Sequence, residues 1–194
     1  MQSDNSKIQV IFNGLTFSKK EIKIIESTLH KVNVKKGTTL LNAGHIVENI
    51  YYIYDGCLRT YHIDKNGKKH TLQFALKDSW ITDFTAFFSN SKALLNIEVL
   101  KDATIYKLSA KDKDYLIHQV PQIQPFIINK LELAFSNLQK RILANLSQTA
   151  TEQYLNFITT YPDIEQNVKN YHIASYLGIT TESLSRIRKD LLNA

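Results

Sequence analysis

The sequence predicts an α+β chain in which a β-rich domain is followed by one long helix and a pair of short terminal helices. Three observations support this fold class. Short β-rich runs alternate with turn signals between residues 32 and 108. Apolar residues then recur at helical spacing between residues 122 and 147. Finally, a glycine separates two helical segments close to residue 194.

An amphipathic helix is expected to open the domain over residues 18–30. Ser18 can cap its N-terminus, and Glu21, three residues further on, would complete a capping box. The side chains expected to face the core are Ile22, Ile25 and Leu29.

Many short strands are expected over residues 32–108. The residues that separate the strand-like runs are Gly37, Gly44, Gly56 and Gly67. Asn66-Gly67 between two such runs is a strong hairpin signal. This strand spacing favours a sandwich or a small barrel. The single cysteine, Cys57, is expected to be buried in a strand. One cysteine cannot form an intramolecular disulfide, so a disulfide framework is excluded.

A long helix is expected over residues 122–147, after a capped segment that begins at Ser109. Its apolar residues recur at spacings of 3, 4, 3 and 4, namely at Ile128, Leu131, Phe135, Leu138 and Ile142. This pattern indicates a coiled-coil seam, although a helix packed on its own domain remains an alternative. Because monomers rarely expose such a stripe, we expect a homodimer. A further helix is expected over residues 149–160.

The last segment predicts a helix-turn-helix. Apolar Ile173, Ala174 and Leu177 fall on one face of a short helix, and Gly178 supplies a residue that tolerates positive φ. Thr180 or Thr181 can cap the second helix, which is expected over residues 183–192. The side chains expected to face inward from this second helix are Leu184, Ile187 and Leu191.

The polar side chains of the second helix suit DNA reading. They are Thr181, Glu182, Ser183, Ser185, Arg186, Arg188 and Lys189. Such a helix can lie in the major groove, where Arg186 would donate to a guanine and Glu182 would accept from a cytosine amino group. Two structural alternatives are open: an ordinary αα corner, and a solvated ion pair between Glu182 and Arg186.

Charge and hydropathy limit the partners. The net charge of +6 suits an anionic partner, but residues 1–120 hold a balance of +5 and residues 121–194 only +1. No apolar run approaches the ~18 residues of a membrane helix. The initial MQSDNSKIQV has no signal-peptide core. We therefore expect a cytoplasmic protein with no membrane partner.

The order of strands, long seam helix and helix-turn-helix resembles the catabolite-activator and fumarate-nitrate-regulator (Crp/Fnr) family of bacterial transcription regulators. The closest local match is LGITTESLSRIRKDL, where Glu182 and Arg186 fall on the family's base-reading Glu and Arg. Thr181 falls where the catabolite activator has an Arg, so the half-site sequence cannot be copied across.

This resemblance implies three parts. A β jelly-roll, cyclic-nucleotide-binding-like effector domain would span residues 1–120, and a dimerisation helix residues 121–147. A helix-turn-helix DNA-binding domain would span residues 148–194, and we expect it to lack the C-terminal wing of many relatives. The implied partners are double-stranded DNA, a second copy of the chain, a small effector of unassigned identity and RNA polymerase.

The effector segment departs from the family's cyclic AMP pocket, which has a Gly-Glu pair and an Arg followed by Ser/Thr-Ala. The candidate pocket residues here are Trp80, Thr82, Asp83, Lys92, Leu94 and Asn96. No Arg occurs between residues 91 and 96, and Lys cannot replace the bidentate guanidinium fork on a phosphate. Cyclic AMP binding is therefore not expected. With one cysteine, an iron–sulfur cluster is not expected either.

Two further function classes are open beside a dimeric, sequence-specific transcription regulator. One is a ligand-binding sensor module whose helix-turn-helix is vestigial, which the nearly neutral C-terminal part favours. The other is a cupin-type enzyme, which requires clustered metal ligands. His62 and His70 lie eight residues apart without an H-x-H pair, and no nucleophile elbow, P-loop or H-E-x-x-H is present. We therefore expect no enzymatic activity.

Overall fold

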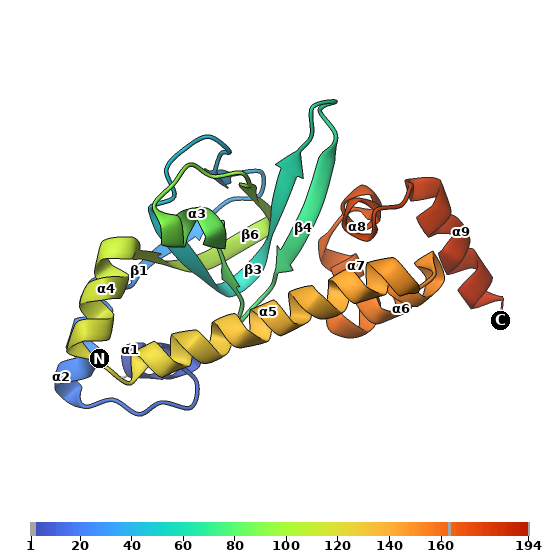
Figure 1. The fold of residues 1–194 in the computed structure, drawn as a ribbon. Coiled ribbons are helices and arrows are strands. Elements are labelled where there is room, and N and C mark those ends of the chain that lie inside the picture. Colours follow the sequence, from blue (N-terminus) through green and yellow to red (C-terminus); the bar gives the residue numbers. More distant parts are fainter. Residues whose placement is uncertain (1–2, 163, 194) are drawn as a thin grey trace.

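A six-stranded antiparallel sheet forms the centre of the N-terminal half of the protein. The structure, a computed structural model, describes residues 3–162 and 164–193. The strands are β1 (His30–Val34), β2 (Thr39–Leu41), β3 (Asn49–Ile63), β4 (Lys69–Ala75), β5 (Trp80–Ile81) and β6 (Asn96–Ser109). The α+β class predicted from the sequence is confirmed (Figure 1).

The two long strands β3 and β6 organise this sheet. They pair with each other from Asn49 opposite Ser109 to Tyr61 opposite Asn96. The main strand order is β1-β6-β3-β4, while β2 also pairs with β6 and β5 with β3. Each long strand therefore has different neighbours at its two ends, and the sheet wraps around a core of aliphatic and aromatic side chains.

The prediction of many short strands was wrong at Gly56, because β3 passes through this residue without a turn. Gly56 has a φ of +110°, and the register with β6 shifts on both sides of it. A Cβ at this position would lie 2.4 Å from the Cβ of Ala103. Glycine here therefore marks a bulge where two backbones approach closely, rather than the end of a strand.

The hairpin predicted at Asn66-Gly67 is confirmed, since it joins β3 to β4. Gly67 has a φ of +80°. The Asp64 carboxylate accepts hydrogen bonds from the amides of Asn66 and Lys68, which fixes the turn. Cys57 is fully buried as expected, and burial raises the pKa of its thiol to about 12.

Short helices pack around the β domain. They are α1 (Ser3–Ile11), α2 (Lys19–Thr28), α3 (Phe84–Ser89) and α4 (Ala110–Gln119). The capping box predicted at the start of α2 is present, with the Ser18 amide donating to Glu21 at 2.7 Å. Helix α1 was not predicted from the sequence, and it buries Ile8 and Ile11 in a second apolar cluster with residues of α2 and β6.

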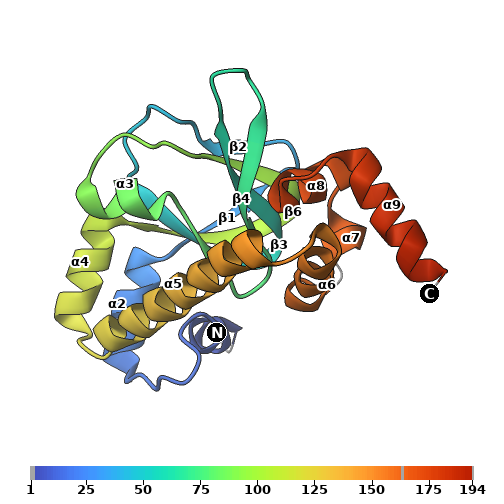
Figure 2. The same ribbon diagram turned by 45° about the vertical axis from the view of Figure 1, so that its right-hand side comes forward.

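The long helix α5 (Ile123–Ser147) connects the β domain to a C-terminal group of helices (Figures 1 and 2). That group consists of α6 (Ala150–Thr160), α7 (Ile164–Asn167), α8 (Asn170–Leu177) and α9 (Thr181–Leu192). A third apolar cluster joins this group to Phe74 and Leu100 of the sheet. Among the described residues, no helix is long and apolar enough to span a bilayer.

Candidate nucleic-acid interface and ligand cavity

Helices α8 and α9 are joined by the tight turn expected at Gly178. This residue caps α8 in the left-handed conformation, with a φ of 71°. The Ile179 amide then donates to the Ala174 carbonyl at 3.0 Å, which closes the helix end. Thr180 is the cap of α9, since its hydroxyl accepts from the Ser183 amide at 3.2 Å. The second helix therefore begins at Thr181, two residues earlier than expected.

The inner face of α9 packs as expected except at its end. Leu184 and Ile187 are buried against Ile173 and Ala174 of α8. Leu191 was expected to face inward, but 37% of it is exposed, so that expectation was wrong. It lies in the last turn of α9, and the buried cluster of this domain does not include it.

The outer face of α9 presents polar side chains to solvent. Glu182, Ser185, Arg186 and Lys189 are exposed, whereas Thr181 and Ser183 are partly buried. No ion pair joins Glu182 to Arg186 in the part of the chain that the structure describes, although the two lie one helical turn apart. Hydrogen bonds from its own amide and from Thr180 lower the pKa of Glu182, which keeps the carboxylate ionised as an acceptor.

Arg188 has a different placement from the other candidates. Its guanidinium donates to Asn170 Oδ1 at 2.7 Å, to Tyr154 Oη at 3.2 Å and to the carboxylate of Glu165. These contacts tie α9 to α6, α7 and α8. The expected phosphate contact of Arg188 is thus not supported by its placement, because its donors are engaged within the domain.

A buried histidine on α8 lies between the two halves of the molecule. His172 is 5% exposed, and its Nδ1 has no hydrogen-bond partner among the described residues. Burial, followed by the nearby Arg59 guanidinium, lowers the pKa of His172 to about 4, and Glu98 opposes this only in part. Lys69 and Lys169 add to the lowering. His172 is therefore neutral in the folded protein near pH 7.

The low pKa of His172 predicts a specific loss of stability in acid. Its unfolded pKa is near 6.5, so only the unfolded chain binds a proton as the pH falls from 6.5 towards 4. The neutral, buried His172 therefore stabilises the folded protein fully above pH 6.5, and this contribution is lost as the pH falls from 6.5 to 4. Urea unfolding at pH 7.5 and pH 5.0 should show a loss larger by about 2 kcal/mol in the native protein than in His172→Phe. Equal losses would mean that His172 titrates normally.

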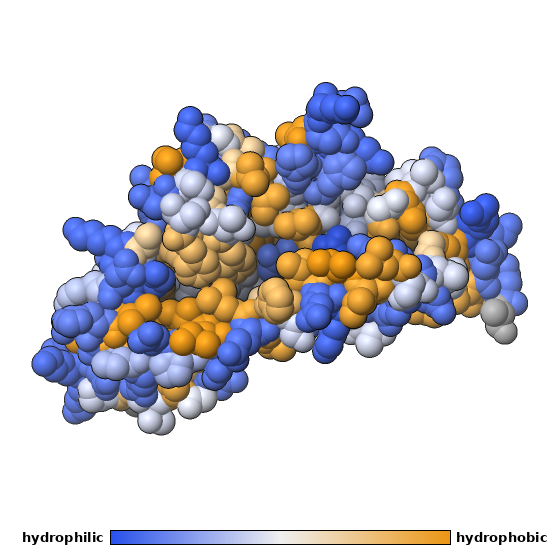
Figure 3. Space-filling model, in the orientation of Figure 1, coloured by the Kyte–Doolittle hydropathy of each residue, from blue (hydrophilic) through white to orange (hydrophobic). Residues whose placement is uncertain are grey.

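The seam predicted on α5 is open to solvent in a single chain. Ile128, Phe135, Leu138 and Ile142 are 46%, 70%, 47% and 51% exposed, and Leu131 is partly buried. Figure 3 shows apolar surface gathered along this helix. Leu146, at 80% exposure, extends the same stripe by one turn.

The six candidate pocket residues have different surroundings in the structure. Asp83 caps α3 and accepts from the amides of Ala86, Leu94 and Leu95, so its carboxylate is used within the chain. Thr82 donates to the Asn49 carbonyl at 2.9 Å. Three others differ widely in exposure, since Asn96 is buried, Lys92 is exposed and Leu94 is 67% exposed.

Trp80 points to another part of the domain. Its ring contacts Tyr52 and Phe12, with centroids 5.2 Å and 6.4 Å away, in the cluster that carries the N-terminal helices. The sequence placed Trp80 beside Asp83 in one pocket, but its strand β5 directs the ring away from the sheet core. The Trp80 ring and the Asp83 carboxylate therefore face different neighbours.

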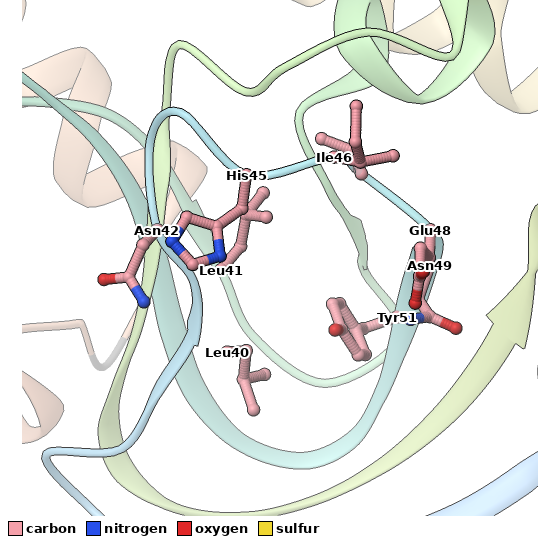
Figure 4. A pocket seen from close by; sticks show the side chains of 9 residues that line it. Leu40, Leu41, Asn42, His45, Ile46, Glu48, Asn49 and Tyr51 are labelled. Carbon is pink, nitrogen blue, oxygen red and sulfur yellow. The ribbon is translucent and has the colours of Figure 1, made fainter.

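A cavity of about 160 Å³ lies instead beside the loop before β3 (Figure 4). Its lining residues are Leu40, Leu41, Asn42, His45, Ile46, Val47, Glu48, Asn49 and Tyr51. Leucine and tyrosine side chains form an apolar part, while Asn42, His45 and Glu48 add polar groups. The sequence signal for this site was slight: a glycine turn at Gly44 flanked by polar residues. Among the described residues, no cluster of three His, Cys, Asp or Glu could hold a metal ion.

Known proteins share this organisation. Residues 31–119 match the cyclic nucleotide-binding domain family. The chain is 22% identical to the fumarate and nitrate reduction regulatory protein of Salmonella typhi, over 89% of the chain and 73% of the relative. It is 25% identical to the cAMP-activated global transcriptional regulator CRP of Haemophilus influenzae, over 84% of the chain and 76% of the relative. Together these matches support a regulator of the Crp/Fnr family.

A solved structure has a closely similar fold. FixK2 from Bradyrhizobium japonicum superposes with a TM-score of 0.75 over 85% of each chain, at 17% identity. This likeness establishes a shared fold. Both curated relatives align with most of the chain, and their names describe regulatory proteins rather than enzymes.

Proposed function

We propose that this Crp/Fnr protein binds double-stranded DNA as a homodimer and reads base sequence with α9. The observation that carries the proposal is the exposed outer face of this helix. Arg186 and Glu182 lie on one face, near the helix N-terminus, where residues of a recognition helix reach base edges. Ser185 and Lys189 extend the same face. Thr181 and Ser183 flank it at the helix start.

The dimer is supported by the apolar stripe of α5. A second copy could cover Ile128, Phe135, Leu138 and Ile142, which otherwise remain largely in water. Burial of apolar side chains is favourable by about 0.8 kcal/mol per methylene group, so two copies of such a stripe have a strong tendency to associate. Two copies of α9 related by a two-fold axis would then face the same side of a duplex.

DNA binding itself is tested by a salt titration. The affinity for a duplex should fall steeply as salt rises from about 50 to 200 mM, because Lys and Arg side chains displace counterions from phosphates. The measurement is fluorescence anisotropy of a labelled duplex. No detectable binding at about 50 mM salt would remove the proposal, whereas binding without salt dependence would contradict a phosphate-tracking interface.

We further propose that the β domain responds to a small effector other than cyclic AMP. The Haemophilus influenzae relative is cAMP-activated, as its name states. In the present chain, the Asp83 carboxylate accepts from the amides of Leu94 and Leu95 in the segment that corresponds to the family's phosphate site. A cyclic phosphate there would meet a carboxylate rather than an arginine, so the two negative charges would repel.

Titration calorimetry with cyclic AMP is therefore expected to give no micromolar, stoichiometric isotherm. As a matched control, Asp83→Asn removes the charge but keeps a carbonyl oxygen for the same amides. If the native protein binds cyclic AMP at micromolar concentration, the assignment of this segment is incorrect.

A further inference from the structure

Arg141 lies where the long helix, the sheet and the helix-turn-helix meet. From α5, its guanidinium donates to the carbonyls of Leu72 and Thr71 on β4, the latter at 3.4 Å. It also donates to the carbonyl of Tyr176 on α8 at 2.8 Å. The guanidinium carbon lies 3.8 Å from the centroid of the Tyr176 ring. A planar group with five donors can satisfy carbonyls on two elements at once, which an ammonium cannot do with the same geometry.

A second set of hydrogen bonds joins α8 to the same strand. The Thr71 amide donates to Ser175 Oγ at 2.9 Å, and the Ser175 hydroxyl donates to the Lys69 carbonyl at 2.7 Å. Strand β4 is at the end of the main strand order of the sheet, so its outward backbone groups need partners from elsewhere. The Ser175 side chain supplies a donor and an acceptor to this edge.

Aromatic packing supports the same contact. The Phe74 ring of β4 lies 5.4 Å from the ring of Tyr176, 6.0 Å from Phe157 and 6.1 Å from Tyr161. These distances are typical of paired aromatic side chains. In contrast, the direct covalent link from α5 to α6 is short, since α5 ends at Ser147 and α6 begins at Ala150. This link leads into α6, whereas α8 and α9 follow later in the chain and are held by contacts with β4 and α5.

We propose that Arg141 is a positioning residue that fixes α8 and α9 against both α5 and β4. This inference rests on the proposed DNA-binding function in one respect: in a dimer, the fixed placement would set the distance between the two recognition helices. Arg141 touches no DNA in this scheme. It acts through the carbonyl of Tyr176, which belongs to the helix directly before the turn at Gly178.

Amide hydrogen exchange tests the positioning without DNA. In Arg141→Ala, the Thr71 amide should exchange roughly tenfold faster or more, because loss of a charge-assisted contact frees α8 from β4. Lys140→Ala removes a neighbouring charge from the exposed side of α5 and should leave Thr71 exchange unchanged. The Ile105 amide in the buried centre of β6 reports global unfolding. Unchanged Thr71 exchange in Arg141→Ala, with Ile105 protected in both, would overturn the proposal.

Arg141→Lys provides a second variant if the alanine variant is poorly folded. It keeps the charge and the aliphatic stem but cannot span Leu72 and Tyr176 with one planar group. We expect Thr71 exchange close to that of the alanine variant. Native-like exchange in the lysine variant would show that charge alone suffices and would contradict a geometric role for the guanidinium.

Binding to palindromes of varied half-site spacing tests the consequence for DNA. The native protein and Lys140→Ala should prefer one spacing near a helical turn by about tenfold over neighbouring spacings. In Arg141→Ala this preference should shrink to about threefold or less, with weaker binding at the best spacing. Tighter binding or an unchanged spacing preference would overturn the inference. If the native protein prefers no site while Thr71 still loses protection in Arg141→Ala, the DNA-binding function fails and the positioning role stands.

Discussion

Phe135→Asp combined with Leu138→Asp is expected to give a folded monomer. Both side chains are largely exposed in a single chain, so the substitutions should leave the fold of each copy intact. In the proposed dimer the same positions form the centre of the α5 seam. Removing four apolar side chains per dimer and burying four carboxylates should raise the dissociation constant on the order of a thousandfold or more. Sedimentation velocity at micromolar concentration measures the change.

Leu133→Asp is the matched control for this experiment. Leu133 is 57% exposed on the same helix, but it lies five residues from Leu138 and faces away from the stripe. This variant should remain dimeric. A stable dimer of the double variant would show that another surface holds the copies together, and dissociation of the Leu133→Asp variant would show that the helix as a whole is sensitive to charge.

Arg186→Ala is expected to relax the DNA sequence preference. A good bidentate contact to a guanine contributes about 1–3 kcal/mol of discrimination per base pair. Because a dimer has two copies of this contact, specific affinity should fall by roughly 30-fold or more, while binding to random DNA should change little. Competition between a selected site and single-base variants of that site measures the discrimination directly.

The Lys189→Ala variant distinguishes a phosphate contact from base recognition on the same helix. With Lys189 on the phosphates, its loss should weaken all sequences by a similar factor and reduce the slope of log affinity against log salt by about 2, since each copy in the dimer loses one contact. Selectivity among sites should persist. Equal loss of selectivity in the Lys189 and Arg186 variants would contradict the assignment of base reading to Arg186.

Local signals in the sequence predicted those elements whose ends are fixed by neighbouring residues. Ser18 with Glu21 and Thr149 with Glu152 both form the capping boxes that start α2 and α6. Gly178 closes α8 because a left-handed residue is required within that turn. In each case the partner atoms lie within about four residues in the chain.

Features that depend on contacts between residues far apart in the chain could not be predicted from local sequence patterns. Gly56 was interpreted as a turn because its contact with Ala103 is remote in sequence. The hydrogen bonds by which Arg188 and Arg141 hold separate elements together were not predicted, since their acceptors lie on other helices and on β4. The neighbours of Trp80 were not predicted either, because the direction of its ring depends on how β5 pairs with β3.

The central claim is that two copies of α9 read one DNA site. Selection of the native protein on random duplexes, at about 0.15 M salt, tests it most directly. The account predicts an enriched, roughly palindromic motif whose half-sites lie about one helical turn, ~10 base pairs, apart. It also predicts that Arg186→Ala loses a guanine–cytosine preference at one position of each half-site. Enrichment of no motif by the native protein, with or without added small metabolites, would contradict sequence-specific recognition by this chain.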